Sequence, residues 1–397
     1  MLNVVIDATP INPKPTGVGF HIANLISSLS DLQQQENFRL GLVFQPRLES
    51  WLRGNWNFPD SLKSYSNTHF FPMPVRVSDL LLATESKPLF SYFERYFGNP
   101  HVIHGTNYSV YPCRKSLKVM NLYDLTFMKY PKYIDSVVAK YADKVKRCLK
   151  WTDLIITISE SSKKDIIEYL HVEPEKIHIT HLASRYSQDK LSLKQVENFV
   201  DVGYDFSQPY LLFVSTIEPR KNVDALITAF NYLKSKYKIP HNLVLIGKKG
   251  WHYESTFTAI ENSPWNNSIR HLDYLSDDLV ALFYSKADAF VYPSYYEGFG
   301  LPVLEAMTLG APVICSNSSS IPEVAGDAAV QVNPDEPIEL AEAILNVISD
   351  SQLRQELISK GKKRAKLFTW ERTARETLKV YRNCLNYDLK TNELILS

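Results

Sequence analysis

The segment Glu297-Gly-Phe-Gly-Leu-Pro-Val-Leu-Glu305 follows a short apolar run, Ala289-Phe-Val-Tyr292, which we predict to be a strand. Gly298 and Gly300 allow a tight turn with positive φ or a close backbone approach. Pro302 suits the first turn of a helix, where its missing N–H is not needed. A strand, a glycine turn and a helix in this order are one unit of an α/β fold with a parallel sheet.

The two carboxylates of this segment fall where ligands of open α/β sheets bind, outside the carboxyl end of a strand. Carboxylates accept pairs of hydrogen bonds from vicinal hydroxyls, so Glu297 and Glu305 suit a sugar and a ribose. The N–H groups at Phe299–Val303 are placed to hold a diphosphate or sugar hydroxyls. The alternative is a surface glutamate together with a glutamate that the helix dipole favours at a helix start.

Short apolar runs alternate with stretches of helical periodicity along all 397 residues. The predicted strands are 4–7, 40–44, 102–104, 119–122, 154–158, 210–214, 242–246, 289–292 and 312–315. In the second half the predicted helices are 222–237, 276–286, 302–309, 337–349, 351–366 and 370–386. A polar stretch over 184–208 separates two such runs, so we expect domains at 1–200 and 201–375, with 376–397 as a last helix.

A second motif, Ser215-Thr-Ile-Glu-Pro-Arg-Lys-Asn222, directly follows the strand predicted at 210–214. Arg220 and Lys221 stand between a strand end and a helix start, where two cations can neutralise a diphosphate leaving group as its charge develops. A solvated pair of loop cations is the alternative.

The first half has weaker motifs. Thr16-Gly-Val-Gly-Phe20 is a truncated glycine turn, in which Gly17 and Gly19 allow either close approach to a ligand or simple turn geometry. Tyr123 and Asp124 follow the strand 119–122, so we expect both to point into the cleft between the domains. His104 is a minor candidate, because an isolated histidine is more often structural.

The composition excludes some classes of function. A net charge of +1 argues against nucleic-acid binding. The sequence contains no Asp-x-Asp triplet and no His/Asp cluster, which favours chemistry without a metal. Four scattered cysteines, no signal-peptide pattern and no run of about 18 apolar residues indicate a cytoplasmic protein. These features are compatible with peripheral contact at the inner face of the membrane.

The chain resembles family 4 of the retaining glycosyltransferases, which have the GT-B fold of two Rossmann-like domains facing a central cleft. The resemblance is dense over 210–375 and thinner over 1–200. In the second half it is carried by Glu218–Asn222, Leu243-Val-Leu-Ile-Gly-Lys-Lys-Gly-Trp251, Tyr274-Leu-Ser-Asp-Asp278, the pair Glu297 and Glu305, and Ile321-Pro-Glu-Val-Ala-Gly326. In the first half it is carried by Gly17-Val-Gly19, Asp124-Leu-Thr-Phe127 and Thr157-Ile-Ser159-Glu160.

This resemblance implies that the C-terminal domain binds a nucleotide-sugar donor and the N-terminal domain the acceptor, with the last helix crossing back onto the N-terminal domain. It implies a ribose at Glu305, the transferred sugar at Glu297, and a diphosphate at Arg220 and Lys221. It further implies donor contacts from the backbone of Gly298, Phe299, Gly300 and Leu301, from Ser215, where some members have arginine, and from Tyr274 and Leu275 near the base.

The function expected from this resemblance is metal-independent transfer of a hexose, with retention of configuration, to a glycan or lipid-linked acceptor of a surface polysaccharide. Similarity to mannosyltransferase-like members suggests GDP-mannose, although a UDP-sugar is not excluded. Related sequences often have histidine where this chain has Tyr123, and this departure favours an alternative, a non-catalytic sugar-nucleotide-binding or partner protein. A glycosidase with Glu297 and Glu305 as its acid/base pair is a third reading.

Overall fold

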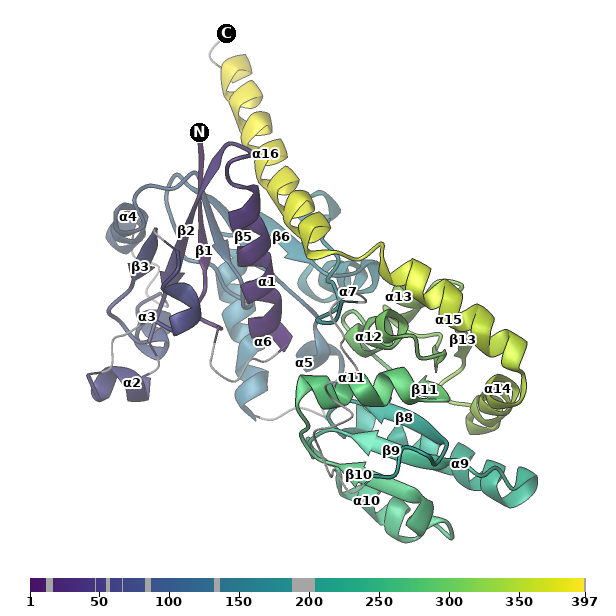
Figure 1. The fold of residues 1–397 in the computed structure, drawn as a ribbon. Helices are drawn as coiled ribbons and strands as arrows, with labels where there is room; N and C mark the ends of the chain where they lie inside the picture. The colour runs from purple at the N-terminus through teal and green to yellow at the C-terminus, as the bar shows by residue number, and fades with distance from the viewer. Residues whose placement is uncertain are drawn as a thin grey trace.

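The protein is built from two parallel sheets, each flanked by helices and each made from one half of the chain (Figure 1). The structure, a computed structural model, describes residues 1–11, 17–46, 48–54, 58–65, 67–82, 87–131, 136–187 and 204–395. The predicted domain boundary at 200/201 lies outside the described residues.

The first sheet has seven strands in the order β3-β2-β1-β4-β5-β6-β7, and every pair of neighbours is parallel. The strand order reverses between β1 and β4, which makes this pair the topological switch point of the sheet. The central strands are buried on both faces, as expected for a parallel sheet covered by helices. The strands are β1 (Leu2–Asp7), β2 (Phe38–Phe44), β3 (Thr68–Phe70), β4 (Val102–Gly105), β5 (Leu117–Asn121), β6 (Leu154–Thr157) and β7 (Ile177–Ile179).

The second sheet has six strands in the order β10-β9-β8-β11-β12-β13, again all parallel. Its switch point lies between β8 and β11, the two strands that precede the Arg220–Lys221 and Glu297–Glu305 motifs. The strands are β8 (Tyr210–Val214), β9 (Asn242–Ile246), β10 (Ile269–Leu272), β11 (Ala289–Tyr292), β12 (Val313–Ser316) and β13 (Ala329–Val332).

The helices follow the expected alternation with the strands. Ser159 caps α7 as its sequence position suggests, because its hydroxyl accepts a hydrogen bond from the N–H of Ser162 at 3.0 Å. In the first half the α-helices are α1 (Gly17–Leu32), α2 (Leu48–Leu52), α3 (Val75–Leu82), α4 (Lys87–Tyr96), α5 (Thr126–Lys129), α6 (Ser136–Leu149) and α7 (Glu160–Leu170). In the second half they are α9 (Val223–Tyr237), α10 (Glu254–Glu261), α11 (Asp277–Lys286), α12 (Leu301–Leu309), α13 (Ile321–Ala325), α14 (Pro337–Ser349), α15 (Ser351–Ala365) and α16 (Trp370–Ile395).

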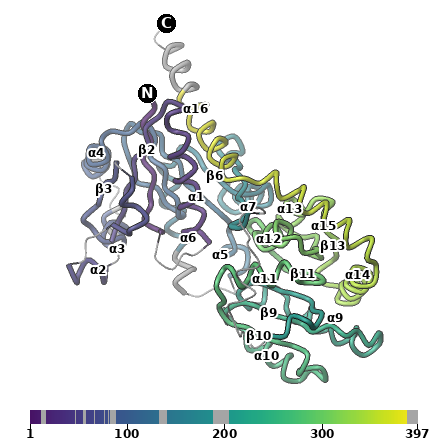
Figure 2. The backbone as a smooth tube through the Cα atoms, viewed as in Figure 1, coloured from purple at the N-terminus to yellow at the C-terminus, as the bar shows by residue number. Residues whose placement is uncertain are grey.

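The last helix, α16, leaves the second half and runs along α1 of the first, as Figures 1 and 2 show from the same side. Ala374, Leu378 and Tyr381 on this helix belong to the same buried apolar cluster as the inner face of α1. The Tyr381 hydroxyl lies 2.6 Å from Nδ1 of His104 at the end of β4. The prediction of a C-terminal helix that crosses back is therefore confirmed, although α16 begins at Trp370 and the expected boundary at 375/376 falls inside it.

The predicted alternation of strands and helices is confirmed, but four strands were not predicted. These are β3, β7, β10 and β13, the edge strands of the two sheets. No helix in the described part of the chain is both long enough and apolar enough to cross a membrane.

Candidate active site

The turn between β11 and α12 has the geometry that its sequence predicts. Gly300 precedes the helix with a φ of +112°, a conformation that favours glycine, and Gly310 ends it with a φ of +84°. Pro302 lies in the first turn of α12. The N–H groups of that first turn have no partner inside the helix, so this end of α12 can receive an anion.

Glu297 lies in this turn and its carboxylate is surrounded by donors. The Lys221 ammonium lies 2.6 Å from Oε1, and the hydroxyls of Ser294 and Tyr292 donate to the same oxygen at 2.7 and 2.8 Å. Arg220 Nη1 lies 3.1 Å from Oε2. The structure therefore joins the two motifs that follow β8 and β11, as the strand order requires. Oε1 receives three of these contacts and Oε2 one, so Oε2 is the oxygen with more room for a sugar hydroxyl.

Burial alone would raise the pKa of Glu297, but the charges of Lys221 and Arg220 and the hydrogen bonds from Lys221 and Ser294 outweigh it and lower this pKa to about 2. Glu297 is only 8% exposed, so its charge is held inside the protein. A carboxyl group that stays ionised at neutral pH does not serve as a general acid, so Glu297 does not take that role in the glycosidase reading.

An open basin lies beside this cluster, between the ends of β8 and β9. Its lining includes the four cations Arg220, Lys221, Lys248 and Lys249, together with Glu218, whose carboxylate lies 2.8 Å from Arg220 Nη2. The Lys248 ammonium lies 5.0 Å from the ring centre of Tyr274, which is 71% exposed. Within the described residues neither Lys248 nor Lys249 has a carboxylate partner in a salt bridge. The basin therefore has the charge to hold a diphosphate.

Sequence reasoning missed Lys248 and Lys249 as site residues, although a signal for them was present. Both follow Gly247 at the end of β9, which is the same position that drew attention to Arg220 after β8. Gly247 has a φ of +148°, and an added Cβ would lie 1.9 Å from the carbonyl oxygen of Ser215. Only glycine lets the loops after β8 and β9 approach this closely. This approach places Lys248 and Lys249 at the edge of the basin.

Glu305 is not an open carboxylate. It is 2% exposed, and Arg185, in the segment that follows β7, places Nε 2.6 Å from its Oε1. Arg185 also lies 3.1 Å from Oδ1 of Asp277, and its guanidinium lies 5.8 Å from the ring centres of Phe20 and Tyr186. Burial raises the pKa of Glu305, and Arg185 partly offsets this. The arginine thus occupies a position that the sequence analysis assigned to a ribose.

The first half contacts this turn through Asp124 and α7. An added Cβ on Gly298 would lie 2.9 Å from Cβ of Asp124, so Gly298 is a point of close backbone approach, as predicted. The hydroxyl of Ser159 donates to the Gly298 carbonyl at 2.7 Å. Glu323 of α13 accepts from the N–H groups of Glu160 and Ser161 at 2.7 and 2.8 Å. The turn therefore lies directly between the two halves.

The expectation that Tyr123 points into the cleft is wrong. Its side chain is 5% exposed, and its hydroxyl donates to the carbonyl of Thr106 at 2.8 Å and lies 2.9 Å from Nδ1 of His21. Burial lowers the pKa of His21 to about 3, so that ring is neutral. Because side chains alternate along an extended segment, the outward Asp124 turns Tyr123 toward the core.

The remaining candidates are spread over the site. Gly17 and Gly19 are the first residues of α1 and neither has a positive φ, so simple helix-start geometry accounts for them. Phe299 is 3% exposed, and its ring lies 6.0 Å from that of His181 at a tilt of 38°. Ser215 lines the cationic basin. Leu301 begins α12, and Leu275 lies half-buried beside the exposed Tyr274.

His104 forms hydrogen bonds with Asn121 and Tyr381 in the core, so its role is structural.

The described residues contain no group of three or more His, Cys, Asp or Glu side chains placed to hold a metal ion.

The sequence is similar to known proteins. Residues 196–364 match the family described as glycosyl transferases group 1. The chain is similar to O-antigen chain mannosyltransferase B of Escherichia coli, with 29% identity over 389 residues that cover 96% of this chain and 100% of that protein.

Two solved structures share the fold. Sucrose-phosphate synthase from Thermosynechococcus elongatus superimposes with a TM-score of 0.70 at 17% identity, covering 98% of this chain and 100% of the other. Anabaena HepE in complex with UDP-glucose superimposes with a TM-score of 0.68 at 14% identity, covering 96% and 100%. The protein is therefore a glycosyltransferase with the GT-B fold, similar over residues 196–364 to the group 1 family and over nearly its whole length to an O-antigen mannosyltransferase.

Proposed function

We propose that this enzyme transfers a hexose from a nucleotide sugar to a glycan or lipid-linked acceptor during synthesis of a surface polysaccharide. The similarity to O-antigen mannosyltransferase B supports mannose as the sugar and GDP-mannose as the donor. The observation that carries the proposal is the buried group of Glu297, Lys221 and Arg220 at the switch point of the second sheet, beside the cationic basin.

In this proposal the basin binds the donor diphosphate. Lys248, Lys249 and the exposed edge of Arg220 face its charge, and the first turn of α12 adds its N–H groups. Negative charge grows on the diphosphate as the bond to the sugar breaks, so fixed cations there stabilise the transition state more than the ground state. These protein cations supply the positive charge, and the reaction needs no metal.

Glu297 positions the two cations, and its Oε2 accepts a hydrogen bond from a hydroxyl of the sugar. Its salt bridges hold Arg220 and Lys221 in place, because both cations share one buried anion. The acceptor approaches from the first half, where Asp124 meets Gly298. The configuration of the sugar is retained, as the family resemblance implies.

The ribose of the donor binds at Glu305 and has to share this carboxylate with Arg185 or displace it. Arg185 Nε bonds to Oε1, so a ribose hydroxyl that bonds to Oε2 leaves the salt bridge intact. The base then lies toward Tyr274 and Leu275, beside Lys248.

The test uses the purified enzyme with radiolabelled GDP-mannose, and with UDP-glucose as a second donor. We expect transfer, or slow hydrolysis of the donor, that is unchanged by EDTA. Lys248→Met should raise the donor KM about tenfold, because it removes one charge from the diphosphate site without breaking a salt bridge. Lys360→Met, which removes an exposed lysine of α15, is the control and should leave the KM unchanged.

Two results would contradict the proposal. Loss of activity in EDTA that magnesium restores would show that a metal supplies the charge. Donor binding with neither transfer nor hydrolysis would show that the cluster holds a nucleotide sugar without acting on it.

A further inference from the structure

Helix α7 of the first half carries three polar side chains that face the turn bearing Glu297. Ser159 caps the helix, and Ser162 and Asp165 follow at intervals of three residues, so the three side chains lie along one face. All three residues are buried, with exposed fractions of 0%, 1% and 3%. Buried polar groups need hydrogen-bond partners inside the protein, and here the partners come from the second half.

These side chains bind the residues on either side of Glu297. The hydroxyls of both serines donate to the carbonyl of Gly298, at 2.7 and 3.2 Å. Oδ2 of Asp165 accepts the hydroxyl of Tyr296 at 2.7 Å. The carboxylate of Glu297, in contrast, is held by cations and hydroxyls of the second half. The carboxylate and its two neighbours in the chain are therefore fixed by different halves of the protein.

Tyr296 joins an ion pair of the first half to a cation of the second. Its ring centre lies 5.5 Å from that of Tyr130 and 4.9 Å from the Lys129 ammonium. The same ammonium lies 2.8 Å from Oδ1 of Asp165, so it neutralises the carboxylate that receives the tyrosine hydroxyl. The backbone carbonyl of Tyr296 accepts a hydrogen bond from Arg220 Nη1 at 2.7 Å. The hydroxyl end of this residue is thus fixed in the first half and its backbone end at the proposed diphosphate site.

The bond between Tyr296 and Asp165 is well suited to hold this position. Tyr296 is only 1% exposed, so water does not compete for its hydroxyl. Burial raises the pKa of Tyr296, and the charges of nearby carboxylates raise it further, so the hydroxyl stays protonated and donates. A hydrogen bond to a charged acceptor is stronger than one between neutral groups.

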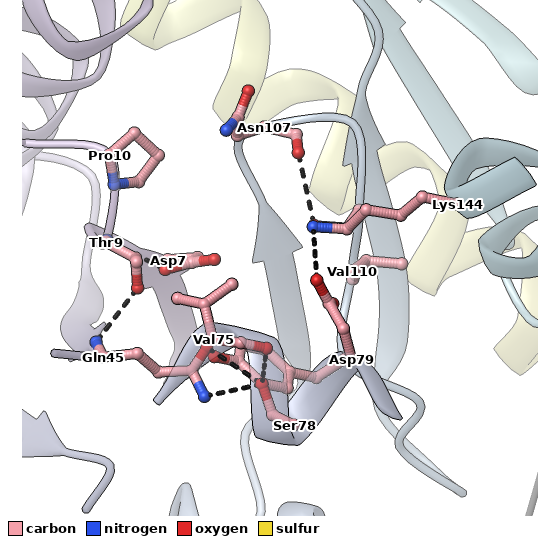
Figure 3. A pocket seen from close by; sticks show the side chains of 12 residues that line it. Asp7, Thr9, Pro10, Gln45, Val75, Ser78, Asp79, Asn107, Val110 and Lys144 are labelled. Atoms are coloured by element: carbon pink, nitrogen blue, oxygen red, sulfur yellow. Dashed lines mark hydrogen bonds and ion pairs between the residues drawn. The ribbon is translucent and has the colours of Figure 1, made fainter. Parts of the chain in front are cut away.

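Other buried polar groups at the edge of the first sheet pair within their own half. Figure 3 shows a small cavity at the end of β1, in which the Gln45 amide donates to the Ser78 hydroxyl at 2.9 Å. In the same cavity Lys144 Nζ lies 3.5 Å from Oδ2 of Asp79. Such pairs stabilise one half only. The hydrogen bond of Tyr296 crosses between the halves, so its loss also changes how firmly the turn is oriented against the first half.

We propose that Asp165 and Tyr296 are positioning residues of the transferase, because their hydrogen bond orients the turn of Glu297 and Arg220 toward the first half, from which the acceptor approaches. This proposal rests on the function proposed above. Both side chains are buried, so they act through Glu297 and Arg220 rather than on the substrates. A misplacement of about 1 Å can slow a reaction about 100-fold, so the bond should affect turnover more than donor binding.

Three variants separate the parts of this contact. Tyr296→Phe removes only the hydroxyl, Asp165→Ala removes its acceptor, and Asp165→Asn keeps an oxygen that can accept the same hydroxyl. Turnover is measured as nucleotide released from saturating GDP-mannose or UDP-glucose, with octyl mannoside as acceptor and without acceptor. We expect Tyr296→Phe and Asp165→Ala to lower kcat about tenfold. Asp165→Asn should lower it less than about threefold, because a neutral acceptor remains. Donor affinity, measured by calorimetry, should stay within about twofold.

Tyr210→Phe is the matched control. Tyr210 is 1% exposed, and its hydroxyl donates to the carbonyl of Phe283 at 2.7 Å, within the second half. Both tyrosine-to-phenylalanine changes break one buried hydrogen bond and should lower the free energy of unfolding to a similar extent. Only Tyr296→Phe should lower kcat. Adding it to Asp165→Ala should slow turnover no further, because both changes remove the same bond.

Hydrogen exchange followed by mass spectrometry tests the contact without turnover. Peptides that cover the turn 293–301 and the start of α7 should exchange faster in Tyr296→Phe, because each loses a contact that holds it. Neither peptide should change in Tyr210→Phe. Faster exchange at the turn alone would overturn the proposal, since a bond between the halves holds both of its partners.

The kinetic outcomes are equally decisive. Wild-type kcat in both Tyr296→Phe and Asp165→Ala would overturn the proposal, and so would a loss of donor affinity as large as the loss of kcat. An equal loss of kcat in Tyr210→Phe would show that reduced stability alone explains the effect. Wild-type enzyme that releases nucleotide from neither donor contradicts the proposed function. Hydrogen exchange then decides on the contact by itself, and unchanged exchange of both peptides overturns it.

Discussion

Replacing Glu297 by glutamine keeps the size of the side chain and removes its charge. Lys221 and Arg220 then lose their shared anion, and Lys221 is only 4% exposed. In the folded protein the pKa of Glu297 falls from 4.5 to about 2, which corresponds to about 3 kcal/mol of stability at neutral pH. Breaking a buried ion pair by removing one partner costs about 3–5 kcal/mol, in agreement with this value.

Differential scanning calorimetry at pH 7 measures this loss. For a domain of about 150–250 residues, a loss of 3 kcal/mol lowers the melting temperature by about 6–12 °C. The depressed pKa of Glu297 gives the sign of the pH dependence. The stabilisation is complete well above pH 4.5 and is lost as the pH falls through 4.5 toward 2. At pH 4 the wild type should already have lost roughly 0.8 kcal/mol of its advantage over Glu297→Gln.

The control is Glu356→Gln, which breaks an exposed pair with Lys360 on α15. It should cost less than about 0.5 kcal/mol, because exposed pairs one helical turn apart contribute little. Equal melting temperatures of Glu297→Gln and wild type at pH 7 would refute the reasoning. A difference that persists undiminished as the pH falls toward 4 would refute the assignment of the effect to the charge of Glu297.

Three further substitutions test other parts of the site. Arg185→Met leaves Glu305 buried without its cation and should cost about 3 kcal/mol, measured as a lower melting temperature; an unchanged value would contradict the buried pair. Gly298→Ala places a Cβ 2.9 Å from Cβ of Asp124 and should lower the transfer rate at least about tenfold while donor affinity, measured by calorimetry, stays constant. Tyr123→Phe removes a buried hydrogen bond and should cost about 1–2 kcal/mol in urea unfolding, with the donor KM unchanged; lower activity at wild-type stability would show a catalytic role instead.

The sequence predicted the centre of each sheet and not its edges. Central strands such as β8 (Tyr210–Val214) are buried and read as continuous apolar runs. The four missed strands have three or four residues each, and polar side chains interrupt them, as in Ile177-His-Ile179 and Ile269-Arg-His-Leu272. An edge strand is covered less completely, so its sequence does not carry the apolar signal that identifies the others.

The site was predictable where it depends on local structure. The turn from Glu297 to Leu301 and the cations after β8 follow from residues that are close in sequence to a strand end. The partner of Glu305 was not predictable in this way, because Arg185 is 120 residues away and lies in 180–187, a described stretch that forms no strand or helix. The prediction for Tyr123 was wrong for another reason. The position of the strand alone did not specify which of the two adjacent side chains, Tyr123 or Asp124, faces inward.

The crossing of α16 has a consequence for the order in which the protein matures. The ribosome makes the first half of the chain first, and domains generally begin to fold as they emerge. That half cannot complete its core at this stage, because Ala374, Leu378 and Tyr381 are synthesised only after the second sheet. The inner side of α1 and the ring of His104 stay uncovered until α16 has been synthesised. A chain released early, upstream of Trp370, would therefore carry two well-formed sheets and one exposed apolar groove, and quality-control proteases and chaperones would recognise it by that groove.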